Sequence, residues 1–284
     1  MATPLSLFRA IALAAVLGLA TPMLAHADTD TDAGTEAFRT GDYAAAMTAW
    51  LPLAEAGDPA AQFNVGVLHD EGLGVEQNSE EARRWWTLAA ERGLPEAHHN
   101  LALLQIDLAS SEDGGGDLVA ALTHLTAAAE AGHLGARYTL GKLYEYGLGV
   151  EQDPAQSAEH IRQAAEAGLP KAQYNMGKRF RDGLGVEKDE TIAAEWFRRA
   201  ARAGHPGGQD HLARRLRDGQ GVEADPVEAM AMAILATRGG YEDARRLAEE
   251  LKEPLSIGEL DQAFSRANEF KPESVLGPVG AEEQ

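Results

Sequence analysis

Residues 136–172 read ARYTLGKLYEYGLGVEQDPAQSAEHIRQAAEAGLPKA, and this stretch contains one complete structural unit. Apolar and small residues at Ala136, Leu140 and Tyr144 have the spacing of one helix face. The glycine-rich turn 147–150 interrupts that helix, and Asp153-Pro154 then supplies an N-cap and a first-turn proline for a second helix. Gly168 ends the second helix, since glycine adopts the left-handed backbone conformation at little cost. The stretch therefore predicts a helical hairpin.

The same pattern recurs along the chain. Gly147, Gly183 and Gly219 each begin a Gly-x-Gly-Val turn and are 36 residues apart. The predicted helix-ending glycines keep this step, except for an interval of 39 residues between the second and third: Gly57, Gly93, Gly132, Gly168, Gly204 and Gly240. A period of this length is typical of arrays in which each unit buries its apolar face against its neighbours. The fold class predicted is all-α, an α/α superhelix (solenoid) of antiparallel helical hairpins with a 36-residue repeat.

Five full units follow an abbreviated first hairpin. Their first helices are predicted at 60–71, 96–109, 135–146, 171–182 and 207–218, and their second helices at 78–92, 117–131, 153–167, 189–203 and 225–239. Gly66, Gly141 and Gly177 share one position within a first helix, where glycine costs about 1 kcal/mol relative to alanine. Close approach of a partner helix would explain these glycines.

The residues of the repeat resemble those of a known family. Ala172-Gln173-Tyr174-Asn175-Met176-Gly177, the turn 183–186, Asp189, Trp196-Phe197 and Ala200-Ala201 are similar to a Sel-one-like repeat, a longer-looped relative of the tetratricopeptide repeat. The resemblance covers residues 35–252. It implies an α/α superhelix that binds other proteins and usually has no catalytic activity.

The two ends of the chain differ from the repeats. Arg9, an apolar run over residues 10–20 and the sequence Ala25-His26-Ala27 are typical of a signal peptide, predicted at 1–27. An uncleaved membrane anchor is the alternative, but the run is short for a membrane span and Pro22 interrupts it. Residues 28–34 are predicted to be flexible, 253–269 to form a C-terminal capping helix and 270–284 to be a disordered tail. Periplasmic or secreted localisation is therefore expected.

Cleavage after Ala27 is the first testable prediction. The small residues at Ala25 and Ala27 fit the cleavage site, so the exported chain should begin at Asp28. Intact-mass measurement of the exported protein checks this, and a mass that retains residues 1–27 would contradict it.

Charge and cysteine content exclude several classes of protein. The chain has a formal charge of −20, which becomes −21 after removal of residues 1–27 because these contain only Arg9. A charge of this size repels polyanions, so binding to nucleic acid is not expected. The absence of cysteine excludes disulfide bonds and a lipidated N-terminal cysteine. No stable membrane insertion is expected after cleavage.

No catalytic or metal-binding motif is evident. His98 and His99 are adjacent and so point about 100° apart on a helix, which makes them a poor metal pair. The Gly-x-Gly-Val turns join helix to helix, whereas a dinucleotide-binding motif joins strand to helix. We expect no enzyme activity, no cofactor and no metal, with a hydrolase as the least favoured reading.

The candidate binding residues lie on the first helices at positions that the repeat does not explain. In tetratricopeptide-like proteins the matching face lines a groove, and Asn64, Asn100 and Asn175 resemble the asparagines that hold a bound peptide backbone. The predicted groove consists of Phe63, Asn64, Asn100, Lys142, Tyr174, Asn175, Lys178, Arg181, Arg214 and Arg217. Its cations suit an acidic or C-terminal segment of a protein partner. The predicted function is an exported adaptor or regulator of an envelope sensor or secretion system. A cell-wall or polysaccharide-binding module is the alternative.

One unit departs from the pattern at residues 110–116, where three glycines replace the usual turn. The segment is either a tolerated surface insertion or a hinge or recognition loop. Consecutive glycines carry high backbone entropy, so this is expected to be the most mobile interior segment.

Overall fold

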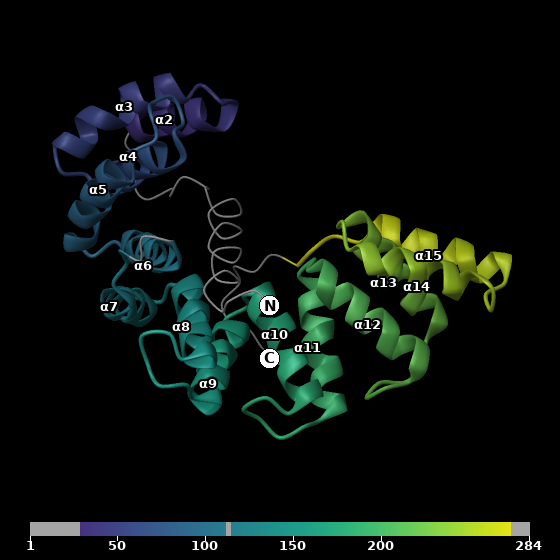
Figure 1. Ribbon diagram of the computed structural model, residues 1–284. Coiled ribbons are helices and arrows are strands. Elements are labelled where there is room, and N and C mark those ends of the chain that lie inside the picture. The colour runs from purple at the N-terminus through teal and green to yellow at the C-terminus, as the bar shows by residue number, and fades with distance from the viewer. Residues whose placement is uncertain (1–28, 112–114, 274–284) are drawn as a thin grey trace, which may run out of the picture. The chain divides into compact units, whose positions relative to one another are not determined.

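The computed structural model describes residues 29–111 and 115–273 (Figure 1). All regular secondary structure in these ranges is α-helical, which confirms the predicted class. The helices are α2 (Thr29–Thr40), α3 (Tyr43–Glu55), α4 (Pro59–Glu71), α5 (Ser79–Glu91), α6 (Pro95–Ser110), α7 (Leu118–Glu130), α8 (Leu134–Tyr146), α9 (Pro154–Glu166), α10 (Pro170–Asp182), α11 (Glu190–Arg202), α12 (Pro206–Asp218), α13 (Pro226–Arg238), α14 (Glu242–Lys252) and α15 (Ile257–Glu269).

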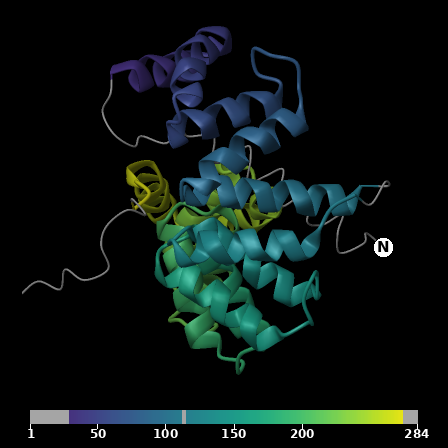
Figure 2. The same cartoon turned by 90° about the vertical axis from the view of Figure 1, so that its left-hand side faces the viewer.

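The chain divides into two compact units, one up to Glu151 and one from Gln152 onward. Within each unit, most helices that follow one another in the chain pack side by side, as Figures 1 and 2 show for α4 with α5 and for α10 with α11, whereas α15 packs against α13. This nearest-neighbour packing is typical of a solenoid of helical hairpins. Among the described residues, none of the helices has both the length and the apolar character needed to cross a membrane.

The predicted repeat helices are confirmed, each to within one residue at either end. Their second helices begin where predicted because a side-chain oxygen accepts hydrogen bonds from the first-turn backbone at Asn78, Asp153, Asp189 and Asp225. The six predicted helix-ending glycines all have positive φ, between 80° and 95°. Local chemistry therefore determines where each helix starts and stops.

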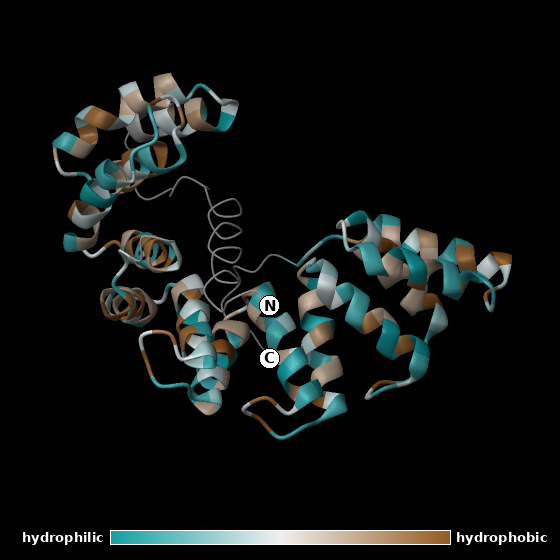
Figure 3. Cartoon of the chain, viewed as in Figure 1, coloured by the Kyte–Doolittle hydropathy of each residue, from teal (hydrophilic) through white to brown (hydrophobic). Residues whose placement is uncertain are grey.

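The core combines many buried alanines with larger apolar side chains from each hairpin. In the first unit Trp50, Trp86 and Leu125 are buried in separate clusters, whereas a single cluster around Phe197 runs through much of the second unit. Figure 3 shows hydrophobic residues interspersed with hydrophilic ones along the helices. Alanine on the facing helices allows close packing around these larger residues.

Two of the mid-helix glycines are explained by close approach, as predicted. A Cβ at Gly66 would lie 2.5 Å from Nε1 of Trp86, and one at Gly177 would lie 2.7 Å from the Phe197 ring. Trp86 also donates from Nε1 to the Phe63 carbonyl at 3.1 Å. The absence of a side chain at the glycine thus allows the aromatic ring of the second helix to pack directly against the backbone of the first helix.

The second glycine of each Gly-x-Gly-Val turn packs against the preceding hairpin. Cβ atoms at Gly185 and Gly221 would overlap the carbonyl oxygens of Pro154 and Glu190, which are the first residues of α9 and α11. Gly74 and Gly149 pack in the same way, on Tyr43 and Leu118. The turn therefore fixes the stacking of one hairpin on the previous one, a role that the sequence pattern did not reveal.

A side chain near the start of four of the first helices, α4, α8, α10 and α12, provides a second tie between hairpins. Gln62 Nε2 donates to the Ala54 carbonyl at 3.1 Å, and Gln173 donates to Ala165 at 3.2 Å. Gln209 donates to the Ala201 carbonyl at 3.4 Å. In the repeat that begins with α8, Arg137 replaces the glutamine and donates to the Ala129 carbonyl at 2.6 Å. These bonds satisfy carbonyls near the end of the preceding helix.

The chain ends differ in part from the prediction. Helix α2 begins at Thr29, so residues 29–34, which were predicted to be flexible, are helical, and Gly34 lies against the Trp50 ring. Helix α15 confirms a C-terminal helix within 253–269, and Ser256 with Glu259 forms its capping box. Residues 270–273 have no regular secondary structure, but Glu273 is hydrogen-bonded to Arg202 of α11, which corrects the start of the predicted tail. The predicted signal peptide, residues 112–114 of the glycine loop, and tail residues 274–284 lie outside the described ranges.

Candidate partner-binding face

The candidate residues of the first unit are mostly buried. Phe63 is 8% exposed and belongs to the core cluster around Trp86, while Asn64 and Lys142 are each 5% exposed. The Lys142 ammonium pairs with Glu145 at 2.7 Å and lies 4.8 Å from the centre of the Tyr146 ring. Asn100 is partly exposed. A partner could contact Phe63, Asn64 or Lys142 only after side chains moved, so most of this unit's candidates are interior residues.

The candidates of the second unit lie on a partly exposed polar surface. Helix α10 contributes Tyr174, Asn175, Lys178 and Arg181, and α12 contributes Arg214 and Arg217. An ion pair joins Arg217 to Glu250 of α14, so this helix extends the surface. We call it the polar face, and it consists of Tyr174, Asn175, Lys178, Arg181, Asp182, Asp210, Arg214, Arg217, Asp218, Arg246 and Glu250.

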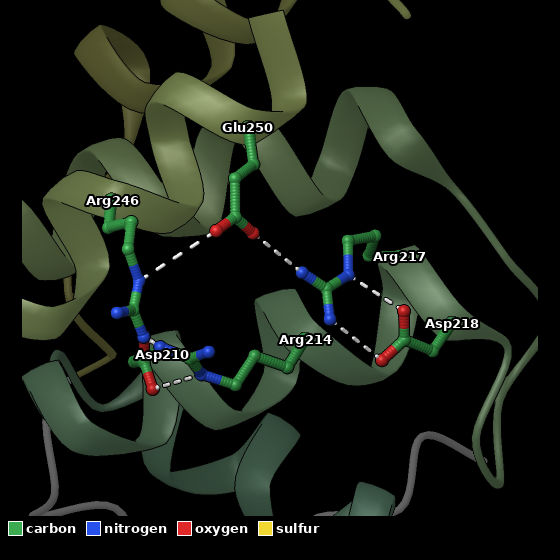
Figure 4. A network of polar contacts seen from close by, with 6 residues as sticks. All are labelled: Asp210, Arg214, Arg217, Asp218, Arg246 and Glu250. Carbon is green, nitrogen blue, oxygen red and sulfur yellow. Dashed lines mark hydrogen bonds and ion pairs between the residues drawn. The ribbon is translucent and has the colours of Figure 1, made fainter.

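Ion pairs neutralise most of the predicted positive charge. Arg217 binds Asp218 through two hydrogen bonds, at 2.7 and 3.0 Å, and also reaches Glu250 at 3.0 Å (Figure 4). Glu250 in turn pairs with Arg246 at 3.7 Å. Arg181 binds Asp182 in the same two-bond manner, with both distances at 2.7 Å. The stripe of cations predicted from the sequence is therefore a network of alternating charges.

Arg214 has a structural partner. Its guanidinium binds both carboxylate oxygens of Asp210, at 2.9 and 3.0 Å, and Asp210 is only 2% exposed. Hydrogen bonding to this carboxylate raises the pKa of Arg214. Removing Arg214 would leave a buried carboxylate without its cation, which is costly. Arg214 therefore has a structural role, which is to neutralise the buried Asp210 carboxylate.

Aromatic rings form the support beneath the face. Tyr174 stacks on His205 with ring centres 4.7 Å apart, and His211 stacks on Phe197 at 4.7 Å with an interplanar angle of 13°. Burial, followed by the neighbouring arginines and Lys178, lowers the pKa of His211 to about 3. Burial is also the main reason that the pKa of Tyr174 is raised. Both rings are therefore neutral near pH 7.

Lys178 and Asn175 complete the face. The Lys178 ammonium lies 5.7 Å from the centre of the Tyr174 ring, and it forms no ion pair with any residue in the described ranges. Asn175 donates from its amide nitrogen to the Lys171 carbonyl at 2.9 Å. Of the predicted cations in this unit, Lys178 is thus the one whose charge has no carboxylate held against it in the part of the chain that the structure describes.

Histidines in the first unit form pairs that the sequence did not predict. Nδ1 of His98 lies 3.0 Å from Nδ1 of His124, and His99 stacks on His133 with ring centres 4.5 Å apart. Helix spacing turns His98 and His99 toward different neighbours, as expected from their adjacency. Over residues 29–111 and 115–273, no group of three or more metal-ligating side chains is close enough to hold a metal ion.

Comparison with known proteins identifies the repeat. The Sel1 repeat model matches residues 59–94, 95–133, 135–169, 170–205 and 206–241. A Sel1 repeat protein from Oxalobacter formigenes has a similar structure, with 28% identity, a TM-score of 0.65 and coverage of 84% of this chain and 97% of its own. The protective antigen c5321 of uropathogenic Escherichia coli, which displays an SLR fold, has 26% identity and a TM-score of 0.72. That match covers 99% of this chain and 60% of the antigen.

A curated relative matches over a shorter region. The putative sel1-like repeat-containing protein L21 of Acanthamoeba polyphaga mimivirus is 28% identical over 87 residues, which is 31% of this chain and 15% of the viral protein. Sel1 repeats generally mediate interactions between proteins and typically form scaffolds without enzyme activity. The repeat matches together cover more than half of the residues, which confirms the predicted resemblance. The chain belongs to the Sel1 repeat family.

Proposed function

We propose that this protein is an exported interaction scaffold whose polar face binds an acidic segment of a partner protein. The observation that carries the proposal is the position of Lys178 beside exchangeable arginine pairs on α10 and α12. The Sel1 repeats support an interaction role, and the features of residues 1–27 support export. Regulation of an envelope sensor or secretion system is the biological setting that we favour for such a scaffold.

Exchange of carboxylates is the proposed mode of binding. The side chains of Arg181 and Arg217 are 30% and 35% exposed, and Asp182 and Asp218 are each 36% exposed. Ion pairs as exposed as these contribute roughly 0–1 kcal/mol, so a partner carboxylate can replace the internal one at small cost. Lys178 offers an ammonium that needs no such exchange. An extended acidic segment could therefore run from Lys178 across the arginines.

Reversing charge on this face tests the proposal. We expect Lys178→Glu combined with Arg181→Glu to weaken binding of the partner about tenfold or more at low salt, because both groups would then repel carboxylates. The control is Lys188→Glu with Arg199→Glu, which changes the net charge equally within the same unit but away from the polar face. Arg214 is unsuitable as a test position because of its bond to the buried Asp210.

The experiment uses the three proteins as baits in an envelope extract of the source organism. Proteins retained by the wild type and the control, but lost from the face variant, are identified and their affinities measured. Circular dichroism establishes that all three baits are equally helical. A natural partner that binds the face variant as tightly as the control variant would refute the polar face as the site. Co-sedimentation with purified cell wall tests the alternative function, binding to cell wall or polysaccharide.

A further inference from the structure

A pocket of about 580 Å³ lies in the second unit, on helices α11 to α13. Leu212, Leu216, Val222 and Met232 give it an apolar lining, and Arg198 and Arg202 of α11 stand at its edge. This volume is within the range of protein ligand sites, roughly 300–1,000 Å³. Of the three acidic lining residues, Asp225 and Glu228 are balanced by Arg266 of α15, at 3.7 and 2.8 Å, and the third, Glu223, is exposed. The site therefore offers an apolar surface with cations on the α11 side.

The chain itself leads to the edge of this pocket. After α15, residues 270–273 lead to the end of α11 (Figure 1). The Glu273 backbone N–H donates to the Arg202 carbonyl at 3.0 Å, and the Glu273 carboxylate lies 4.0 Å from the Arg202 guanidinium. Pro272 packs at Gly204, where an added Cβ would lie 3.2 Å from its ring. Arg202, which holds this segment, is also a lining residue of the pocket.

We propose that the pocket binds the chain's own next residues, with Val275 and Leu276 as the apolar anchors. Leu276 is three residues beyond Glu273, which gives it a reach of roughly 10 Å from the attachment at Arg202. These two apolar residues follow the attachment at Glu273 after a single serine, and they match the lining of leucine, valine and methionine.

Tethering makes weak binding sufficient. A short linker gives an effective concentration in the millimolar range, so anchors of low intrinsic affinity still occupy the site. The bound segment would act as an internal ligand that competes with any partner segment of the same chemistry. This inference does not depend on the polar face, which lies on α10, α12 and α14.

Disulfide trapping in the full chain tests the inference, because the wild type contains no cysteine. The reporter pair is Ala224→Cys, at an exposed lining position, with Gly277→Cys next to the anchors. We expect rapid intramolecular disulfide formation under mild oxidation. Adding Val275→Asp and Leu276→Asp should slow it at least tenfold, since charged anchors would not enter an apolar pocket. Moving the helix cysteine to Arg199→Cys, near Arg202 but outside the lining, should also slow it at least tenfold.

The rates decide between occupants. Equal trapping with and without the aspartates, or equal trapping at positions 199 and 224, would show a tail that merely collides with the surface and would overturn the proposal. A disulfide-linked dimer as the main product would mean that the pocket takes the segment of a second copy, which also overturns the intramolecular assignment. Slow trapping in the reporter pair itself would exclude binding of this segment altogether.

Discussion

Acidification from pH 7 to pH 5 is expected to destabilise the fold, because buried histidines gain protons on unfolding, and His99, His205, His211 and Asp70 together account for a net loss of about 4–5 kcal/mol. Burial lowers the pKa of His99 to about 3, of His205 to about 4 and of His211 to about 3, against about 6.5 in an unfolded chain. Their stabilising contribution is complete above pH 6.5, decreases as the pH falls, and is lost once the pH is below the folded values. Each of the three costs about 2 kcal/mol at pH 5, from about 1.4 kcal/mol per pKa unit.

The surroundings of each ring explain why it resists protonation. His99 is 4% exposed, and its Nε2 has no hydrogen-bond partner in the part of the chain that the structure describes. His205 caps α12, since its Nδ1 accepts from the Gly208 backbone N–H at 3.1 Å, and a proton on Nδ1 would remove that acceptor. His211 is surrounded by cations, namely Arg181, Arg215, Arg214 and Lys178. In each case the charged imidazole is disfavoured in the folded state.

Asp70 opposes this trend. Burial, with Glu71 and Asp107 nearby, raises its pKa to about 6, so protonation between pH 7 and 5 favours the folded state and returns about 1.4 kcal/mol. The net loss is still comparable with the total stability of many domains, about 5–15 kcal/mol.

Urea unfolding at pH 7, 6 and 5, monitored by circular dichroism, measures the decrease in the free energy of unfolding. As a control, His205→Asn keeps a side-chain oxygen for the cap but does not titrate, so the pH dependence should become shallower by about 2 kcal/mol at pH 5. A free energy of unfolding that is constant over this range would contradict the expectation.

Replacing Gly185 with alanine is expected to destabilise the protein by about 4 kcal/mol, whereas the same change at Gly183 should cost only about 1 kcal/mol. Both residues are in the left-handed region, with φ of 73° and 71°, so both substitutions strain the backbone equally. The two positions differ in how much room an added Cβ would have. At Gly183 the nearest atom to an added Cβ is 3.6 Å away, but at Gly185 the Cβ would overlap the Pro154 carbonyl of α9. Backbone at a helix start cannot move aside without separating the two hairpins.

The matched pair lies in one turn, so urea unfolding of both variants isolates the contact from the strain. Gly221→Ala repeats the test one unit later, where the overlap is with the Glu190 carbonyl, and it should resemble Gly185→Ala. Equal destabilisation at Gly183 and Gly185 would show that the contact between hairpins contributes nothing.

The sequence alone determined the helices, their ends and the repeat. Each of these depends on interactions within a few residues, such as the cap of Asp189 on Thr191 and Ile192, or the positive φ of Gly204. The family follows from the same local features, because they recur at a fixed spacing. The boundaries of the repeat helices were therefore predictable to within one residue.

Only the tertiary structure decided which candidates face solvent and which charges are free. Phe63 and Tyr174 occupy the same repeat position, yet Phe63 is in the core and Tyr174 is partly exposed on the polar face. Arg217 is neutralised in part by Glu250, 33 residues later. Such burial and pairing depend on how neighbouring hairpins stack, which in turn depends on backbone contacts such as Gly185 with Pro154. A repeat pattern records that a residue lies on a helix face, but the packing of the next hairpin decides whether that face is left open.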